Sequence, residues 1–241
     1  VPKSGRYQRT DEYIDVLKKS WYSEKDFDHQ GEFYQAEKAF SAIKPSQQRL
    51  PVFFGGSSED AIRVAGKHAD VFALWGEPLA SAAETVAAVK ASAAQHQRDI
   101  DFSISFRPIL GKTEEEAWAK ADEILAKATA QRATSGQTLA AKPQSVGAQR
   151  LLNAVAKGDR LDSCLWTGIA GLIGGGSNST ALVGTPEQVS DALLKYYDLG
   201  ITTFLIRGFD PLNDAVEYGK SLIPLTKQKI AARQAAHHPA R

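Results

Sequence analysis

The stretch PVFFGGSSEDAIRVAGKHADVFALWGEP, residues 51–78, decides the fold class of this chain. An apolar run ends in Gly-Gly-Ser-Ser (55–58), a helical pattern follows at once, and a second apolar run ends at Trp75. Glycine lets the backbone turn tightly and approach a ligand, while serine caps a helix whose free N–H groups attract anions. The segment therefore predicts a strand–loop–helix–strand unit with a phosphate site in its loop. An ordinary helix N-cap without a ligand is the alternative.

Strand-like runs recur along the chain and alternate with helical patterns. Four of them are rich in β-branched or aromatic residues: Val52–Gly55, Val71–Trp75, Phe102–Leu110 and Thr203–Arg207. Strands that alternate with helices are typical of parallel βαβ units. The sequence therefore predicts an α/β protein.

Two of the helices carry clear start signals. Thr113 and Glu116 form a predicted capping box, and Thr185 with Gln188 forms another with proline at the first helical position. The second of these helices is expected to end at Gly200. Gly111-Lys112-Thr113 resembles the end of a nucleotide-binding P-loop, but the earlier glycine is missing, so we interpret it as a turn into a capped helix.

The other segments are less regular. A helix over Tyr13–Leu17 and a hairpin-like connection, EFYQAEKAFSAIKP (32–45), precede the first strand. A long insert at about 126–180 contains a predicted helix around GAQRLLNAVAKG and the glycine-rich GLIGGGSNST. We expect the insert to be a lid or an oligomer contact, with a plain flexible linker as the alternative for its glycine-rich part. Residues 1–226 are expected to form one domain, and the basic segment 227–241 a frayed tail.

Composition sets limits on partners and location. The net charge of +1 gives no electrostatic reason to expect nucleic acid or an anionic membrane as a partner. Cys164 is the single cysteine, and no apolar leader is evident, which favours a reducing, cytoplasmic location. The chain lacks methionine and begins with Val1, so we expect a longer N-terminal region upstream.

No metal site is predicted, because His29, His68 and His96 lie far apart without partners at ligand spacing. Arg107 and Arg207 each end an apolar strand, where a barrel enzyme places its active site, so both are candidates to bind an anion. The alternative for Arg107 is an ion pair with a glutamate of the neighbouring helix.

Two aromatic residues also lie at strand ends. Trp75 ends the second strand and Phe209 follows the fourth, so either could contact a planar ring of a ligand. Core packing is the alternative for both.

Five segments together resemble the bacterial luciferase-like superfamily, and within it the alkanesulfonate monooxygenases most. They are SGRYQRTDEYI (4–14), FFGGSSEDA (53–61), DVFALWGEP (70–78), TALVGTPEQV (180–189) and DLGITTFLIRGFDPL (198–212). The resemblance covers about residues 4–226 and preserves the order and spacing of these motifs.

The resemblance implies a (β/α)8 TIM barrel that binds reduced flavin mononucleotide (FMN) supplied by a separate flavin reductase. Such enzymes use dioxygen to oxidise a small organic substrate, and the sulfonate enzymes release an aldehyde and sulfite. It also implies assembly as a homo-oligomer. By the family motifs, the flavin phosphate is held by Arg6, Tyr7, Gly56, Ser57 and Ser58.

Compared with the family, the chain covers only the C-terminal half of the barrel, about four β/α units plus the insert. A non-catalytic half-barrel that needs its missing N-terminal half is therefore an alternative interpretation. The sulfonate enzymes have an Arg-x-His pair where this chain has Ser105 and Arg107, an arginine near the position of Gly174, and a tyrosine where this chain has Phe209. The residues at all four positions therefore differ from those of the sulfonate enzymes. Arg107 and Arg207 are then left to hold the substrate or a flavin peroxide. A sulfone, an amine or another xenobiotic is the alternative substrate, and deazaflavin the alternative cofactor.

Overall fold

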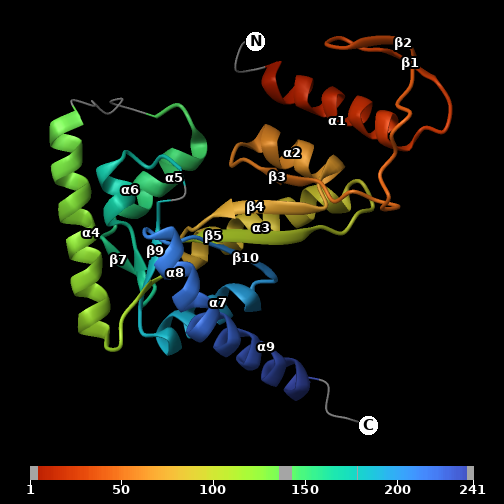
Figure 1. Cartoon of the computed structure of the whole chain (residues 1–241). Helices are drawn as coiled ribbons and strands as arrows, with labels where there is room; N and C mark the ends of the chain where they lie inside the picture. Colours follow the sequence, from red (N-terminus) through yellow and green to blue (C-terminus); the bar gives the residue numbers. More distant parts are fainter. Residues whose placement is uncertain (1–4, 136–142, 178, 238–241) are drawn as a thin grey trace. The chain divides into compact units, whose positions relative to one another are not determined.

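The computed structural model describes residues 5–135, 143–177 and 179–237, and it divides into two compact units (Figure 1). Unit 1 comprises residues 1–72 and 88–100, and unit 2 comprises residues 73–87 and 101–241. The chain passes from one unit to the other within β4 (Val71–Trp75) and α3 (Leu79–Ala94). The other elements of unit 1 are α1 (Arg6–Tyr22), β1 (Phe27–Gln30), β2 (Gln35–Ala39), β3 (Phe53–Gly55) and α2 (Glu59–His68).

Unit 2 contains the remaining helices and strands. In chain order these are β5 (Asp101–Phe106), β6 (Ile109–Leu110), α4 (Glu114–Ser135), α5 (Val146–Val155), β7 (Arg160–Leu161), β8 (Leu165–Trp166), α6 (Gly168–Leu172), β9 (Ala181–Gly184), α7 (Pro186–Asp198), β10 (Thr203–Ile206), α8 (Pro211–Glu217), the π-helical turn η2 (Tyr218–Leu222) and α9 (Ile223–His237).

In unit 1, α1 is followed by the antiparallel hairpin β1–β2, which confirms the predicted helix and hairpin-like connection. The Glu12 carboxylate holds the hairpin turn by accepting hydrogen bonds from the backbone N–H groups of Phe33 (2.9 Å) and Tyr34 (2.8 Å). A carboxylate that is half-buried, as Glu12 is, gains from such donors. Glu12, a residue of α1, therefore connects the hairpin to this helix.

The predicted strand–loop–helix–strand unit is present as β3, α2 and β4. The Ser58 hydroxyl caps α2 by accepting a hydrogen bond from the Ala61 N–H at 3.2 Å. The helix buries Ala61, Val64 and Ala65 on one face, as its apolar spacing requires.

Unit 2 holds the parallel strands β10 and β5, and β4 lies on the other side of β5. In the register of β10 and β5, Thr203 lies opposite Ser103 and Ile206 opposite Phe106. Phe102, Ile104 and Phe106 are fully buried, so β5 is a central strand with apolar contacts. The described residues form an α/β arrangement and no closed barrel.

A second four-stranded sheet in unit 2, ordered β6–β9–β8–β7, was not predicted. The expected strand Phe102–Leu110 is in fact two strands, β5 and β6, separated by Arg107 and Pro108. Proline has no N–H for a strand ladder, so the chain leaves the first sheet there, and β6 pairs in parallel with β9 instead.

The helix start signals are confirmed. Thr185 and Gln188 exchange both bonds of the capping box, at 3.3 and 2.9 Å. Thr113 accepts from the Glu116 N–H, but the Glu116 carboxylate bonds the N–H of Lys112, one residue before the cap. The Gly111–Thr113 segment is thus a turn into α4.

The insert and the C-terminal segment differ from expectation. The first part of the insert, up to Ser135, continues α4, and its predicted helix is α5; residues 136–142 and 178 lie outside the described part. The segment 227–237 is not frayed but helical, as part of α9, while 238–241 lie outside the described part. Lys229 and Arg233 bind Asp191 and Asp198 of α7, so ion pairs join this helix to α7.

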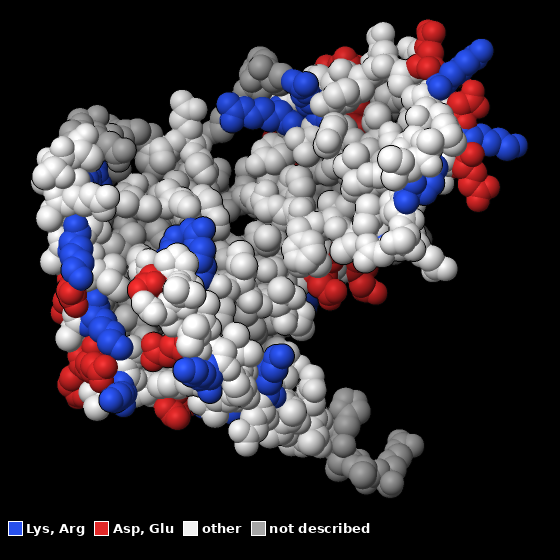
Figure 2. All heavy atoms as spheres, viewed as in Figure 1, with Lys and Arg blue, Asp and Glu red and all other residues white. Residues whose placement is uncertain are grey.

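Acidic and basic side chains are mixed on the visible surface of each unit, in keeping with the small net charge (Figure 2). Of the helices in the described ranges, none combines the length and apolar character that crossing a membrane requires.

Candidate functional site

The predicted phosphate loop lies in unit 1 between β3 and α2. Gly56 has a φ of +154°, a conformation that side-chain-bearing residues rarely adopt. A Cβ atom there would lie 2.6 Å from the Ala61 Cβ and 3.1 Å from the Tyr7 hydroxyl oxygen. Only glycine therefore fits at this position, and the loop backbone is close to both the helix and Tyr7.

The loop presents the N-terminus of α2, where backbone N–H groups favour an anion. Ser58 is committed to capping, while Ser57 lies half-buried in the loop before it. Glu59 and Asp60 are exposed in the first turn. Ala61 and the Tyr7 hydroxyl fill the space beside the Gly56 Cα, so Gly56 and the start of α2 are closely packed.

The N-terminal turn of α1 brings Tyr7, one residue of the predicted Arg6–Tyr7 pair, toward this loop. The Tyr7 ring lies 6.5 Å from that of Phe54 on β3, and its hydroxyl faces Gly56. Arg6 precedes it on the helix and is exposed, so its guanidinium is accessible to a ligand. The structure thus brings Tyr7 and Gly56 together although they are 49 positions apart in the sequence. Two motifs that form one site must meet in this way.

The predicted anion-binding arginines, Arg107 and Arg207, lie in unit 2 at the ends of β5 and β10. They follow the paired residues Phe106 and Ile206, and the Arg207 N–H donates to the Phe106 carbonyl at 3.2 Å. Two parallel strands therefore place two guanidinium groups at the same edge of the sheet, where α/β enzymes bind ligands.

The surroundings of Arg107 orient its side chain. It donates to the Gly208 carbonyl at 2.9 Å and lies 5.0 Å from the centre of the Phe209 ring. Phe209 thus contacts an arginine and packs against the core cluster, which supports its alternative role in packing. Burial, and then the positive charge of Arg207, lower the pKa of Arg107.

Trp75 ends β4 and is half-buried, and the loop after it is tightly held within unit 2. A Cβ on Gly76 would lie 2.4 Å from both the Phe106 ring and the Thr180 hydroxyl oxygen. The Gly76 carbonyl accepts a hydrogen bond from Thr180 at 2.8 Å. The strand end that carries Trp75 is therefore fixed in position.

The next residue, Glu77, was not predicted as functional. Its carboxylate is only 5% exposed and accepts three hydrogen bonds from Arg150 of α5, at 2.6 to 3.0 Å. Its backbone carbonyl accepts from the buried Tyr196 hydroxyl at 2.8 Å. The sequence shows only one sign of this role, an acidic residue directly after an apolar strand. The pair with Arg150 could not be predicted, because Arg150 lies 73 positions away.

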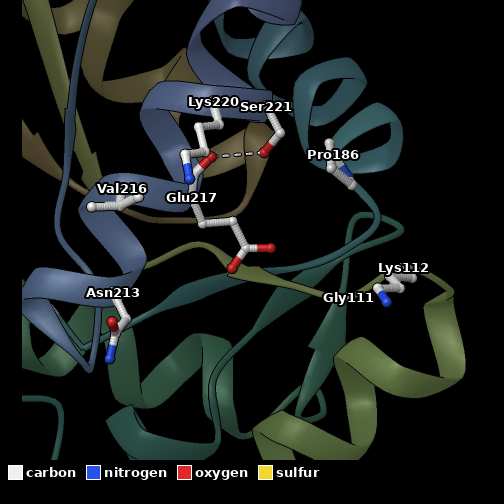
Figure 3. Close-up of a pocket in the computed structure, with 8 residues that line it drawn as sticks. All are labelled: Gly111, Lys112, Pro186, Asn213, Val216, Glu217, Lys220 and Ser221. Atoms are coloured by element: carbon white, nitrogen blue, oxygen red, sulfur yellow. Dashed lines mark hydrogen bonds between the residues drawn. The ribbon is translucent and has the colours of Figure 1, made fainter.

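A cavity of about 360 Å³ lies in unit 2 near the ends of β6 and β9 (Figure 3). Figure 3 shows the Glu217 carboxylate projecting into the space between its own helix and the Gly111–Lys112 turn. The lining residues are Gly111, Lys112, Pro186, Asn213, Val216, Glu217, Lys220 and Ser221. None of the predicted cofactor residues or arginines lines it, so it is separate from the candidate sites.

The family of the chain follows from comparison with known proteins. The luciferase-like monooxygenase family model matches residues 1–203, and the chain belongs to that family.

Three solved structures share its fold. Riboflavin lyase (RcaE), crystallised with modified FMN and riboflavin, is 21% identical with a TM-score of 0.74 over 95% of this chain and 59% of that one. EDTA monooxygenase (EmoA) from Chelativorans sp. BNC1 is 17% identical, with a TM-score of 0.70 over 95% and 62%. The coenzyme F420-dependent tetrahydromethanopterin reductase from Methanopyrus kandleri is 17% identical, with a TM-score of 0.59 over 90% and 63%. The chain thus spans about three fifths of each of these structures.

Proposed function

We propose that this chain is part of a reduced-FMN-dependent monooxygenase that oxidises a small organic substrate with dioxygen. The observation that carries the proposal is the approach of Tyr7 to Gly56 at the N-terminus of α2, in a chain of the luciferase-like monooxygenase family. The TM-score of 0.74 to a structure crystallised with modified FMN is consistent with it.

The residues that would hold the flavin phosphate are Arg6, Tyr7, Gly56, Ser57 and Ser58. Gly56 gives the loop a backbone conformation that other residues rarely adopt. The free N–H groups of α2 would donate to the phosphate oxygens, and Arg6 would neutralise the phosphate charge. Reduced flavin, when bound, supplies the electrons that activate dioxygen. A separate flavin reductase is the proposed source of the reduced cofactor.

Arg107 and Arg207 are proposed to hold an anionic group of the substrate. Two guanidinium groups at one strand edge suit a sulfonate or a carboxylate, because arginine forms paired hydrogen bonds with planar or tetrahedral oxyanions. An alkanesulfonate, giving an aldehyde and sulfite, is the first proposed substrate. A sulfone, an amine or another xenobiotic is the second, because the sulfonate enzymes' histidine and tyrosine positions here hold Arg107 and Phe209.

A flavin fluorescence titration tests the cofactor. We expect a chain extended upstream through further barrel strands to quench FMN fluorescence on binding, and Ser57→Asp to abolish the binding because its carboxylate repels the phosphate. Unchanged FMN affinity in Ser57→Asp would show that the phosphate loop is wrongly assigned. Binding of F420 in place of FMN would favour the deazaflavin alternative. F420 is the deazaflavin to test, because one structural neighbour is F420-dependent.

A second candidate is that the 241-residue chain alone is a non-catalytic half-barrel. It is favoured by the coverage of about three fifths of the matched structures and by β10, an edge strand on which Leu205 is 60% exposed. Gel filtration separates the cases: a stable monomer of 26.1 kDa that binds FMN contradicts this candidate. Association with an upstream fragment or a second copy supports it.

A further inference from the structure

The face of α1 that meets α2 carries charged residues where apolar ones are usual. Ile14 is the one residue of this 17-residue helix that is buried. A surface helix normally docks through an apolar stripe three to four residues wide per two turns. The position of α1 within unit 1 therefore depends strongly on its polar contacts.

Most of these contacts come from four side chains, which we call the anchor cluster: Asp11 and Asp15 of α1, and Lys67 and His68 of α2. Arg63 of α2 also donates to Asp11, at 3.4 Å. The Lys67 ammonium donates to Asp11 at 2.6 Å and to Asp15 at 3.1 Å. His68 Nε2 lies 2.6 Å from an Asp11 oxygen, and the His68 side chain is only 3% exposed. Lys18 adds a hydrogen bond of 3.0 Å to the His68 carbonyl.

The ligand atoms of Asp11, Asp15 and His68 lie within 4.8 Å of one another, which resembles a cation site. Lys67 already bonds both carboxylates, however, and supplies the positive charge that a metal ion would bring. The cluster is therefore a complete ionic contact between two helices.

The cluster is placed to act on the phosphate loop. Tyr7 and Asp11 are four positions apart on α1, so their side chains lie on the same helix face one turn apart. Tyr7 faces Gly56 before the start of α2, while Asp11 contacts Lys67 and His68 at its end. A rotation or slide of α1 that broke the cluster would also move Tyr7 away from the loop.

We propose that the anchor cluster is a positioning device that holds Tyr7 against the Gly56–Ser58 loop and thereby sets the affinity for the cofactor phosphate. This inference rests on the proposed function, because it takes that loop as the phosphate site. The cluster residues themselves do not contact the cofactor.

Asp11→Asn, made in the upstream-extended protein, tests the proposal with two probes, FMN and riboflavin, which lacks the phosphate. Losing the carboxylate removes the charge that binds both Lys67 and His68. We expect the dissociation constant for FMN to rise about tenfold and that for riboflavin to change less than twofold. A role limited to folding would change both affinities alike.

Glu12→Gln is the matched control. Glu12 is the neighbouring carboxylate on α1 and is equally well hydrogen-bonded, but it holds the β1–β2 hairpin and not α2. We expect its FMN affinity to stay within twofold of the wild type. Lys67→Gln is a second test variant, expected to weaken FMN binding like Asp11→Asn, for the case in which Asp11→Asn fails to fold.

The outcomes are distinct. The positioning role would be overturned if folded Asp11→Asn or Lys67→Gln bound FMN as the wild type does, or no more weakly than Glu12→Gln does. The phosphate site would then remain intact. A wild type that binds FMN no more tightly than riboflavin would overturn the phosphate site itself, and the inference with it.

Discussion

The carboxylate of Glu77 and the guanidinium of Arg150 form a bidentate ion pair inside unit 2, joining the loop after β4 to α5 of the insert. The same guanidinium also donates to the Ser81 carbonyl and to Thr85, each at 3.0 Å. These bonds use the Nε and Nη2 donors of Arg150, and the pair with Glu77 raises the pKa of Arg150. A segment expected to be a lid or an oligomer contact is therefore fastened to the strand end that carries Trp75.

Arg150→Ala should destabilise unit 2 by about 3 kcal/mol, because it leaves the carboxylate of Glu77 buried without its partner. Urea unfolding measures the loss. Lys127→Ala is the control, since its pair with Glu123 on α4 is exposed to solvent and should contribute little to stability. Equal losses in the two variants would mean that burial of the Glu77 pair has no energetic consequence.

Gly56→Ala should lower both stability and FMN affinity. The added Cβ would contact Ala61 and the Tyr7 hydroxyl in a backbone conformation that disfavours side chains, at a cost of about 1–3 kcal/mol. Thermal unfolding and flavin titration measure the two effects. Gly219→Ala is the matched control: nothing lies within 4 Å of its new Cβ, so we expect no destabilisation. If Gly56→Ala behaved like Gly219→Ala, the loop would not be closely packed.

The stability of unit 1 should fall as the pH drops below about 6.5, the ordinary pKa of histidine. Burial lowers the pKa of His68 despite its bond to Asp11, so the unfolded chain takes up a proton before the folded one does. Burial alone would raise the pKa of Asp11, but hydrogen bonds from Lys67 and His68 lower it, so a second loss follows at more acidic pH. Stability is thus full above pH 6.5 and declines toward the folded pKa of His68.

The melting temperature of His68→Gln should therefore vary less between pH 7 and 5.5 than that of the wild type. The groups that face His68 are Asp11, Asp15 and Lys18 of α1 and Lys67 of α2. His96→Gln, at an exposed position, is the control and should keep the wild-type slope. An unchanged slope in His68→Gln would assign the pH dependence to another group.

Local structure was largely predictable from the sequence, and long-range pairing was not. The caps at Ser58 and Thr185 were found because a cap depends on residues within four positions. β9 was missed as a strand because its four residues run directly into the Thr185 cap, and its partner β6 exists only because Pro108 breaks the preceding strand. Short strands of this kind depend on tertiary pairing more than on propensity.

The same distinction holds for the candidate sites. The glycine and serines of the phosphate loop have a local pattern, and the structure gives Gly56 the conformation that pattern implies. No partner for His68 is evident at ligand spacing in the sequence, because Asp11 lies 57 positions away and on another helix. Glu77 and Arg150 likewise had no pattern in common. Ion pairs of this kind form when elements distant in the sequence pack together. The spacing of residues within one segment does not predict that packing.

Arg207→Gln should weaken binding of an anionic substrate with little effect on a neutral one. Arg207 is exposed beside the half-buried Arg107, so removing its charge takes away a guanidinium from the strand edge without opening the core. For the extended protein supplied with reduced FMN, we expect the KM for an alkanesulfonate to rise about tenfold, as loss of one charge-assisted contact would produce. Flavin affinity should not change. Arg233→Gln, which breaks only the surface pair with Asp198, is the control. A KM that rises equally for a neutral sulfone would assign Arg207 to general packing of the strand end and remove the basis for an anionic substrate.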